Sequence, residues 1–365
     1  MSEKVAVIAS ILKPVNDTRL YEKLGLSMRE SNKYQVNIIG FGIKKLPSHS
    51  GIRFHSLYQG PRLGLGRLLA PWKFLLKLLR LRPDLTVACT PELLLPAVLY
   101  KIFFRTKLWY DVQENYRKNV QYQSAYPRLL KPFLKLAIWM TEMGTRPFID
   151  QYLLAEKGYV DELTFVQGKH IILENKYHKL DVSRHTSAND KVHLVFTGTV
   201  TRENGIIAAI SLVQALDYKQ YPVQLTIVGQ VPEADLLQQI RNHINNQQHL
   251  IKLVGGTELV PHREVMQCAA NADFGLVAHQ PNPSSENCIP TKIYEYLGLG
   301  LPMLLQSHAL WESVVAPYKA AIVLDYNNFH PETIWMQIKE GGFYTKKPGP
   351  EITWEQEALK LLAQL

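Results

Sequence analysis

The stretch Asn287–Pro302, NCIPTKIYEYLGLGLP, has the pattern of a loop followed by a helix and the start of a strand. Pro290 suits the first turn of that helix, where a missing N–H costs nothing. The N–H groups of Thr291 and Lys292 then point outward from a positive helix end, and the Lys292 ammonium adds a point charge, so the pattern predicts a diphosphate site. Glu295 lies one turn deeper on the same face, where its carboxylate can accept bonds from both hydroxyls of a ribose. The alternative is a capped helix with an exposed Lys–Glu pair.

Short apolar runs alternate with helix-period segments on both sides of this stretch. In the first half the runs cover residues 4–10, 34–41, 52–58, 85–90, 107–112, 151–156 and 170–175. In the second half they cover residues 193–198, 223–229, 250–255, 274–278, 302–307 and 321–325. Strands that alternate with helices indicate a parallel sheet covered on both faces. We therefore expect an α/β protein of two tandem Rossmann-like, doubly wound domains, with ligands bound at the carboxyl ends of the strands.

The polar segment Asp181–Lys191, DVSRHTSANDK, has no periodicity and interrupts the alternation. We interpret it as a linker at 181–191 between an N-terminal domain at 1–180 and a C-terminal domain at 192–345. The remaining residues, 346–365, are expected to form a helix that crosses back to the N-terminal domain.

The composition places the chain among globular proteins. It has 365 residues, of which 46% are hydrophobic and 20% charged, enough for two domains of ordinary size. Its three cysteines, Cys89, Cys268 and Cys288, lie far apart, so neither a disulfide framework nor a zinc site is expected. The N-terminus shows no secretory signal, and no run of about 18 apolar residues predicts a membrane-spanning helix. The expected location is the cytoplasm, with a peripheral position on the inner face of the plasma membrane as the alternative.

The net charge of +9 is distributed unevenly. Residues 1–180 contain 28 of the 41 Lys and Arg residues but only 14 of the 32 Asp and Glu residues, so the first half is strongly basic and the second mildly acidic. A basic half indicates an anionic partner, such as a membrane surface or a phosphorylated substrate. A nucleic-acid partner is not expected, because basic and aromatic residues are not interleaved in any recognised module.

PTKIYEY (290–296) resembles the nucleotide-sugar motif of the GT-B glycosyltransferases, in particular glycosyltransferase family 4. In that family a Glu, seven residues and a second Glu lead into a helix, a Gly and a Pro before the next strand. The resemblance makes Glu295 the ribose ligand. It places Asn287 at the first Glu, near the donor sugar, where this sequence departs from the family, and Glu286 is adjacent.

Two further stretches of the C-terminal half resemble the same family. FTGTVTRENGI (196–206) is similar to its first C-terminal strand and glycine-containing loop. Gly198 matches the family's pattern. Asn204 stands where the family usually has a basic residue, and Arg202 is a candidate to supply the lost charge to the phosphates. By itself this stretch also fits an ordinary turn. The segment at 254–277 is similar to the region flanking the base, so Val260 and Pro261 are expected to contact the ring.

In the N-terminal half, residues 13–30 resemble the family's first loop, with Asp17 and Arg19 opening a helix on the acceptor side. The alternative is a capping Asp17 with Arg19 exposed to solvent. WYDVQENY (109–116) resembles a strand end that often carries a His, and Gln113 occupies that position. Gln can bond to a sugar hydroxyl but cannot shuttle a proton. Asp111 and Glu114 remain as polar candidates, Glu114 being favoured as the catalytic group.

Two segments mix basic residues with Leu, Trp and Phe, at 62–82 and 128–135. Lys73, Lys77 and Arg80 are spaced four and three apart and share one helical face, so they can dock on anionic lipid. The alternative is a pair of ordinary Rossmann helices with solvated charges.

The sequence contains neither an Asp-x-Asp motif nor metal-ligand spacing, so no metal and no cofactor are expected. The family resemblance implies a retaining glycosyltransferase that moves a sugar from a nucleoside diphosphate, with UDP favoured, to a glycan or lipid-linked acceptor. The alternatives are a nucleotide-sugar 2-epimerase of the same fold and a non-catalytic nucleotide-sugar-binding subunit, because Gln113, Asn204 and Asn287 each replace a typical functional residue.

Overall fold

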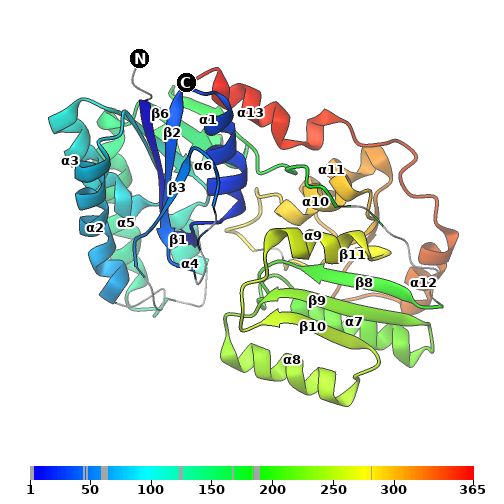
Figure 1. The fold of residues 1–365 in the computed structure, drawn as a ribbon. Helices are drawn as coiled ribbons and strands as arrows, with labels where there is room; N and C mark the ends of the chain where they lie inside the picture. The colour runs from blue at the N-terminus through cyan, green and yellow to red at the C-terminus, as the bar shows by residue number, and fades with distance from the viewer. Residues whose placement is uncertain are drawn as a thin grey trace. The chain divides into compact units, whose positions relative to one another are not determined.

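The computed structural model describes residues 4–43, 46, 48–58, 65–122, 126–166, 168–182, 184, 190–280 and 282–365. The chain divides into two compact units (Figure 1). The first unit contains Met1–Asn175, Asn282–Cys288 and Trp354–Leu365. The second unit contains Lys176–Pro281 and Ile289–Thr353. The chain therefore returns twice to the first unit after the second has begun.

The first unit is built on a seven-stranded sheet of order β3-β2-β1-β4-β5-β6-β7, in which neighbours pair in parallel. Its strands are β1 (Lys4–Pro14), β2 (Tyr34–Phe41), β3 (Ile52–Ser56), β4 (Leu85–Ala88), β5 (Lys107–Val112), β6 (Gln151–Leu154) and β7 (His170–Ile172). The strand order reverses beside β1, which is the pattern of a doubly wound sheet.

The second unit has a six-stranded parallel sheet of order β10-β9-β8-β11-β12-β13. Its strands are β8 (Val192–Thr197), β9 (Val223–Gln230), β10 (Ile251–Gly256), β11 (Phe274–Val277), β12 (Met303–Gln306) and β13 (Ala321–Leu324). Each predicted apolar run coincides with one strand of the two sheets. The prediction of two doubly wound α/β sheets is thus confirmed, because parallel strands buried on both faces read as continuous apolar runs.

Helices cover both faces of the first sheet. On one face lie α2 (Leu65–Leu81), α3 (Leu94–Phe104) and α5 (Lys131–Thr145), and on the other lie the π-helical segment η1 (Thr18–Gly25), α1 (Leu26–Glu30) and α13 (Trp354–Leu362). The shorter helices are η2 (Pro91–Leu93), α4 (Tyr116–Tyr122), η3 (Arg146–Phe148), α6 (Tyr159–Glu162) and η4 (Thr164–Val166). Alternate residues of β1 serve the two layers: Val7 and Ala9 pack toward α2, and Ala6 and Ile8 toward η1.

The second sheet is covered in the same way. One layer contains α7 (Ile206–Tyr218), α8 (Ala234–Asn246) and α12 (Pro331–Glu340), and the other contains α9 (His262–Ala270), α10 (Thr291–Leu299) and α11 (Ala309–Val315). The short helices η5 (Ala316–Tyr318) and η6 (Pro350–Ile352) follow α11 and precede α13. The strands buried between these layers place their carboxyl ends at one edge, where the helices α7, α9 and α10 begin.

The predicted linker is largely absent from the described part of the chain. Residues 183 and 185–189 of the 181–191 segment lie outside it, as does Arg62 of the basic segment. The division between the units follows Asn175, a few residues before the predicted boundary. No helix of the described residues is both long enough and apolar enough to cross a membrane.

The C-terminal helix α13 completes the core of the first unit. Trp354, 2% exposed, packs with the residues of η1 and α1, and its Nε1 donates a hydrogen bond to Ser27 Oγ at 2.9 Å. Leu361 is buried in the same cluster. A residue 327 positions away along the chain therefore closes one face of the first sheet.

Trp354→Ala is expected to lower the free energy of unfolding of the first unit by about 3–5 kcal/mol, because it removes a buried indole and leaves a cavity. Leu359→Ala is the matched control, since Leu359 lies on the same helix and is 62% exposed. Urea unfolding of both variants measures the difference. Equal stability of the two would contradict the assignment of α13 to this core.

Candidate functional site

The start of α10 presents uncapped backbone groups. Pro290 precedes the first helical residue, Thr291, and no side chain caps this end. Ile293 N donates to Pro290 O at 2.9 Å, which leaves the N–H groups of Thr291 and Lys292 without a partner inside the helix. Pro290 is thus the residue before the helix rather than its first member, and the predicted outward amides of Thr291 and Lys292 are in place. Such a helix end attracts an anion.

Lys292 adds a buried cation at the same place. Its side chain is 7% exposed, and within the described part of the chain its Nζ has no hydrogen-bond partner. Nζ lies 4.2 Å from the centre of the Phe196 ring, which provides a weak cation–π contact. Burial lowers the pKa of the ammonium to about 8, and Glu295 opposes this shift. An unpaired buried charge is costly, so this position favours an anionic ligand that would neutralise it.

His279 is a second polar group at this edge, and the sequence did not identify it. It follows β11 by two residues, and its Nδ1 is buried without a hydrogen-bond partner in the ranges that the structure describes. Burial holds the pKa of the imidazole well below its ordinary value, and the Lys292 ammonium adds to this effect. The neutral ring can offer a hydrogen bond to a ligand. The sequence feature that could have identified His279 is its position directly after a strand whose carboxyl end faces the predicted site.

Glu295 is held by a partner from the neighbouring helix. His262 Nε2 lies 3.0 Å from Glu295 Oε1, and both side chains are mostly buried, with 17% and 18% of their surface exposed. His262 is the first residue of α9 and directly follows Pro261. The sequence predicted contacts from Val260 and Pro261 but missed the histidine beside them. Its imidazole fixes the direction of the carboxylate, and the remaining accessible surface can face a ligand.

The loop between β8 and α7 approaches the same edge. Gly198 has φ of +94°, and a Cβ placed on it would meet open space. Gly205 has φ of +81°, and its Cβ would lie 1.7 Å from the carbonyl oxygen of Ala278, so only glycine permits this approach. Asn204, at the family's basic position, donates from Nδ2 to Thr199 O at 2.6 Å and closes the loop. The loop therefore packs on the end of β11 while leaving room at Gly198.

Arg202 is engaged by α8 and its flanking residue. Its Nη2 lies 3.0 Å from Asp235 Oδ2, its Nη1 donates to Gln239 Oε1 at 3.0 Å, and its Nε lies 3.7 Å from Glu233. These groups are largely exposed, so the ion pairs are weak. A phosphate contact by Arg202 stays a prediction, and it requires the guanidinium to exchange these partners.

The N-terminal residues Asp17 and Arg19 have structural contacts. Asp17 Oδ1 accepts from the N–H groups of Arg19 and Leu20 at 3.0 and 3.1 Å, so it caps η1. Arg19 and Asp111, 2% and 0% exposed, form a buried ion pair in which Nη2 lies 2.6 Å from Oδ1. Arg19 Nη1 also donates to Leu173 O at 2.9 Å. The alternative with Arg19 exposed to solvent is therefore wrong, because its side chain is buried in the first unit. Acceptor contacts by Asp17, Arg19 and Asp111 stay a prediction.

Gln113 and Glu114 continue from this ion pair toward the surface. Gln113 Nε2 donates to Asp111 Oδ2 at 2.8 Å. Glu114 lies 3.4 Å from Lys13 Nζ and accepts from Asn119 Nδ2 at 2.6 Å. Its side chain is 37% exposed. Glu114 is thus an accessible carboxylate of the first unit, and its catalytic role stays a prediction.

Asn287 belongs to the first unit, although it precedes α10 by only four residues. Its Nδ2 donates to Glu162 Oε1 at 2.7 Å, which also lies 2.8 Å from Lys118 Nζ. Burial opposes ionisation of Glu162, but hydrogen bonds from Lys118, Asn115 and Asn287 lower its pKa. Glu286 is exposed. The structure therefore does not group Asn287 with Lys292 and Glu295, and its predicted contact with the donor stays untested.

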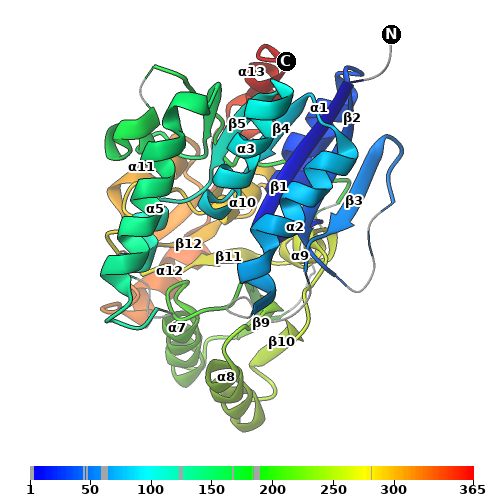
Figure 2. The ribbon, with the colours of Figure 1, turned by 90° about the vertical axis from the view of Figure 1, so that its left-hand side faces the viewer.

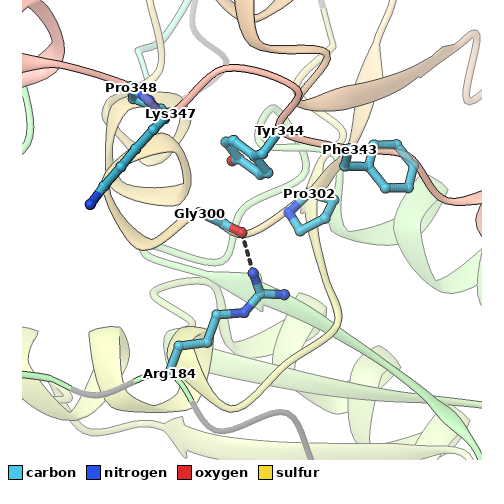
Figure 3. A pocket seen from close by; sticks show the side chains of 7 residues that line it. All are labelled: Arg184, Gly300, Pro302, Phe343, Tyr344, Lys347 and Pro348. Atoms are coloured by element: carbon cyan, nitrogen blue, oxygen red, sulfur yellow. Dashed lines mark hydrogen bonds between the residues drawn. The ribbon is translucent and has the colours of Figure 1, made fainter.

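A pocket of the second unit lies at the opposite end of α10. It is lined by Arg184, Gly300, Pro302, Phe343, Tyr344, Lys347 and Pro348 (Figure 3). Arg184 donates to the Gly300 carbonyl at its rim. The carbonyl end of a helix carries the negative pole, so this pocket lacks the uncapped amides of the α10 start. No group of three metal-ligating side chains occurs among the residues that the structure describes.

No family model matches the chain, and no curated protein matches its sequence. Solved structures do match it in fold. The sucrose-phosphate synthase of Thermosynechococcus elongatus has a TM-score of 0.71 at 15% identity, over 99% of this chain and 98% of that one. Anabaena HepE in complex with UDP and glucose has a TM-score of 0.59 at 13% identity, over 99% and 95%. WaaG, a glycosyltransferase involved in lipopolysaccharide biosynthesis, has a TM-score of 0.61 at 13% identity, over 99% and 95%.

The chain has the GT-B fold. In this GT-B chain the start of α10 lies in the second Rossmann-like unit, at the strand-end edge where open α/β sheets bind ligands. Fold alone does not establish activity. Function is therefore inferred from the side chains gathered there: Lys292, His279, Glu295 and His262.

Lys292→Met is expected to raise the free energy of unfolding at pH 7, by about 3 kcal/mol at most, because it removes an unpaired buried charge. The unfolded lysine keeps its proton up to about pH 10.5, whereas the folded one loses it above about pH 8. Between these values the unfolded state binds more protons, so the wild type gains stability relative to the variant as pH rises. Urea unfolding at both ends of this window measures the effect.

Lys252→Met, at an exposed position, is the control for this measurement. A Lys292→Met variant less stable than wild type at pH 7 would contradict the prediction.

His262→Ala is expected to weaken nucleoside diphosphate binding severalfold, since one lost hydrogen bond is worth about 1 kcal/mol. His262→Gln keeps an N–H donor and should recover most of the affinity. In a Glu295→Ala background the histidine substitution should add little, because the two residues act as a pair. Calorimetric titration with UDP measures wild type, the three single variants and the double variant His262→Ala/Glu295→Ala. Additive losses would show that His262 does not act through Glu295.

Proposed function

We propose that the chain is a glycosyltransferase that binds a nucleoside diphosphate sugar at the start of α10. The observation that carries this proposal is the unpartnered, buried ammonium of Lys292 beside uncapped helix amides. A diphosphate would neutralise the ammonium and accept hydrogen bonds from the amides. Glu295, directed by His262, would accept from the ribose hydroxyls. The matching HepE structures contain UDP or UDP-glucose, which supports UDP as the leaving group.

Transfer breaks the bond between the anomeric carbon of the sugar and the terminal diphosphate oxygen. The diphosphate leaves with the electron pair, the acceptor hydroxyl forms the new glycosidic bond, and its proton is released. Negative charge grows on the leaving diphosphate during this step, so Lys292 and the α10 amides would stabilise the transition state more than the ground state. His279 would add a neutral donor at the same edge. Retention of the anomeric configuration is proposed from the resemblance to glycosyltransferase family 4.

The first unit is proposed to bind the acceptor, a glycan or a lipid-linked glycan. Its excess of Lys and Arg suits an acceptor that carries phosphate or lies at an anionic surface. Glu114 is the accessible carboxylate that we assign to activation of the acceptor hydroxyl. Gln113 cannot perform this step, because an amide does not accept a proton at neutral pH.

Glu295→Ala should lower the affinity for UDP about tenfold or more, because a carboxylate that accepts hydrogen bonds from ribose is worth about 1.5–3 kcal/mol. Glu340→Ala, at an exposed position on α12, is the matched control. Titration calorimetry with UDP measures binding, and release of UDP from UDP-glucose with added acceptor measures turnover. We expect turnover to persist in EDTA, since Lys292 and the helix start supply positive charge at the diphosphate.

Undiminished UDP affinity in Glu295→Ala would refute the site. Conversion of UDP-sugar to its 2-epimer without an acceptor would contradict transfer and identify an epimerase. Binding without turnover, over a panel of acceptors, would identify a non-catalytic binding protein.

A further inference from the structure

The outer helix layer of the first unit exposes apolar side chains. On α2 the exposed positions Leu68, Trp72, Leu76 and Leu79 follow helical spacing, with exposures of 76%, 64%, 55% and 43%. The opposite side of the same helix is also apolar, since Ala70, Phe74 and Leu78 are buried against the sheet. A surface helix of a globular protein normally turns polar residues outward. Helix α2 therefore has two apolar sides, of which the sheet covers only one.

The two neighbouring helices repeat this arrangement. Figure 2 shows α5, α3 and α2 side by side in front of the first sheet, and α3 contacts both of the others. The exposed apolar residues of α3 include Leu95, Leu99 and Phe103, and those at the start and along α5 include Leu129, Phe133, Leu136 and Met140. Phe103 is 77% exposed and Phe133 is 70% exposed. We call this continuous surface of α2, α3 and α5 the apolar face. Its extent marks an interaction site, because isolated soluble surfaces seldom gather large side chains in this way.

The charged residues of α2, α3 and α5 are cationic except for Glu142, and two of the cations, Arg67 and Lys101, pair with Glu92 and Asp150 outside these helices. Among the described residues, no ion pair engages Lys73, Lys77 or Arg80 of α2. Lys131 and Lys135 extend the same charge along α5. Helices α2 and α3 contain no Asp or Glu, and the single carboxyl group of α5, Glu142, is buried, where it accepts from Tyr110 at 3.1 Å. A second copy of this face would bring like charges together without exposed carboxylates on these helices to pair with them.

We propose that the apolar face inserts into an anionic lipid bilayer. An apolar centre with a basic margin matches the interface between acyl chains and phosphate headgroups, where amphipathic helices lie with their apolar side buried about 5–10 Å. Trp72, Phe103 and Phe133 enter the acyl region, and the Lys and Arg side chains extend to the headgroups. This goes beyond glycosyl transfer and differs from docking through charge alone, because insertion of apolar side chains is not weakened by salt.

The test is flotation of the full-length protein with vesicles of phosphatidylcholine and phosphatidylglycerol, and with vesicles of phosphatidylcholine alone. Wild type is expected to float with anionic vesicles at low salt and to stay bound at high salt. The apolar variant Trp72→Gln/Phe103→Gln/Phe133→Gln should bind at least about tenfold more weakly and be released by salt, since each large side chain buried contributes measurably to partition. The charge variant Lys73→Gln/Lys77→Gln/Arg80→Gln should lose its preference for anionic vesicles.

Tyr218→Gln/Met336→Gln is the matched control, because these side chains are 85% and 63% exposed but belong to the second unit. Quenching of tryptophan fluorescence by brominated acyl chains reports insertion directly, and it should decrease in Trp72→Phe and disappear in Trp72→Phe/Trp139→Phe, since Trp139 of α5 is also 43% exposed. UDP titration of every variant shows that the second unit remains folded, so loss of vesicle binding is separable from loss of donor binding. Complete release of wild type by salt without quenching would overturn insertion. Failure to bind vesicles, with dimers seen by light scattering, would assign the face to a protein interface.

Discussion

The parallel order of the second sheet is the constraint on which the site depends. Because β8 and β11 are neighbours and run in the same direction, the loops that follow them end at one edge, together with the start of α10. The Gly205 contact with Ala278 shows how closely these loops approach. Residues far apart in sequence, such as Phe196 and Lys292, thus meet at one helix end. None of these residues alone identifies a binding site; the site exists because the fold brings them together.

Two buried titratable groups at the same edge lower the stability of the protein without a ligand. Lys292 is buried beside Phe196 with a lowered pKa, and His279 is kept neutral next to it. Both arrangements disfavour the empty protein, and both are relieved by an anion. A buried charge without a partner reduces stability, so its presence at a helix start is better explained by ligand binding than by folding. By contrast, the equally buried Arg19 is fully compensated by Asp111 and Leu173 O, and it stabilises the first unit without any ligand.

Much of the fold follows from local pattern, whereas much of the site does not. The strands were predictable because a buried parallel strand is a short apolar run, and the positions of Thr291, Lys292 and Glu295 followed from helix geometry. The roles of His262 and His279 could not be predicted from the sequence, because they arise from contacts between separate helices and strands. The Arg19–Asp111 pair joins residues 92 positions apart, and the bond from Asn287 to Glu162 joins residues 125 apart. Sequence also suggested amphipathic basic helices at α2 and α5, but it could not show that both sides of α2 are apolar, since which side faces the sheet is a tertiary property.

The location of bound nucleotide tests the central claim most directly. A crystal structure of the protein grown with UDP is predicted to place the diphosphate within about 2.7–3.2 Å of Lys292 Nζ and of an amide at the start of α10, with the ribose hydroxyls on Glu295. Nucleotide found instead against Arg184 and Tyr344 at the other end of α10, with the Lys292 ammonium still unpartnered, would contradict the account.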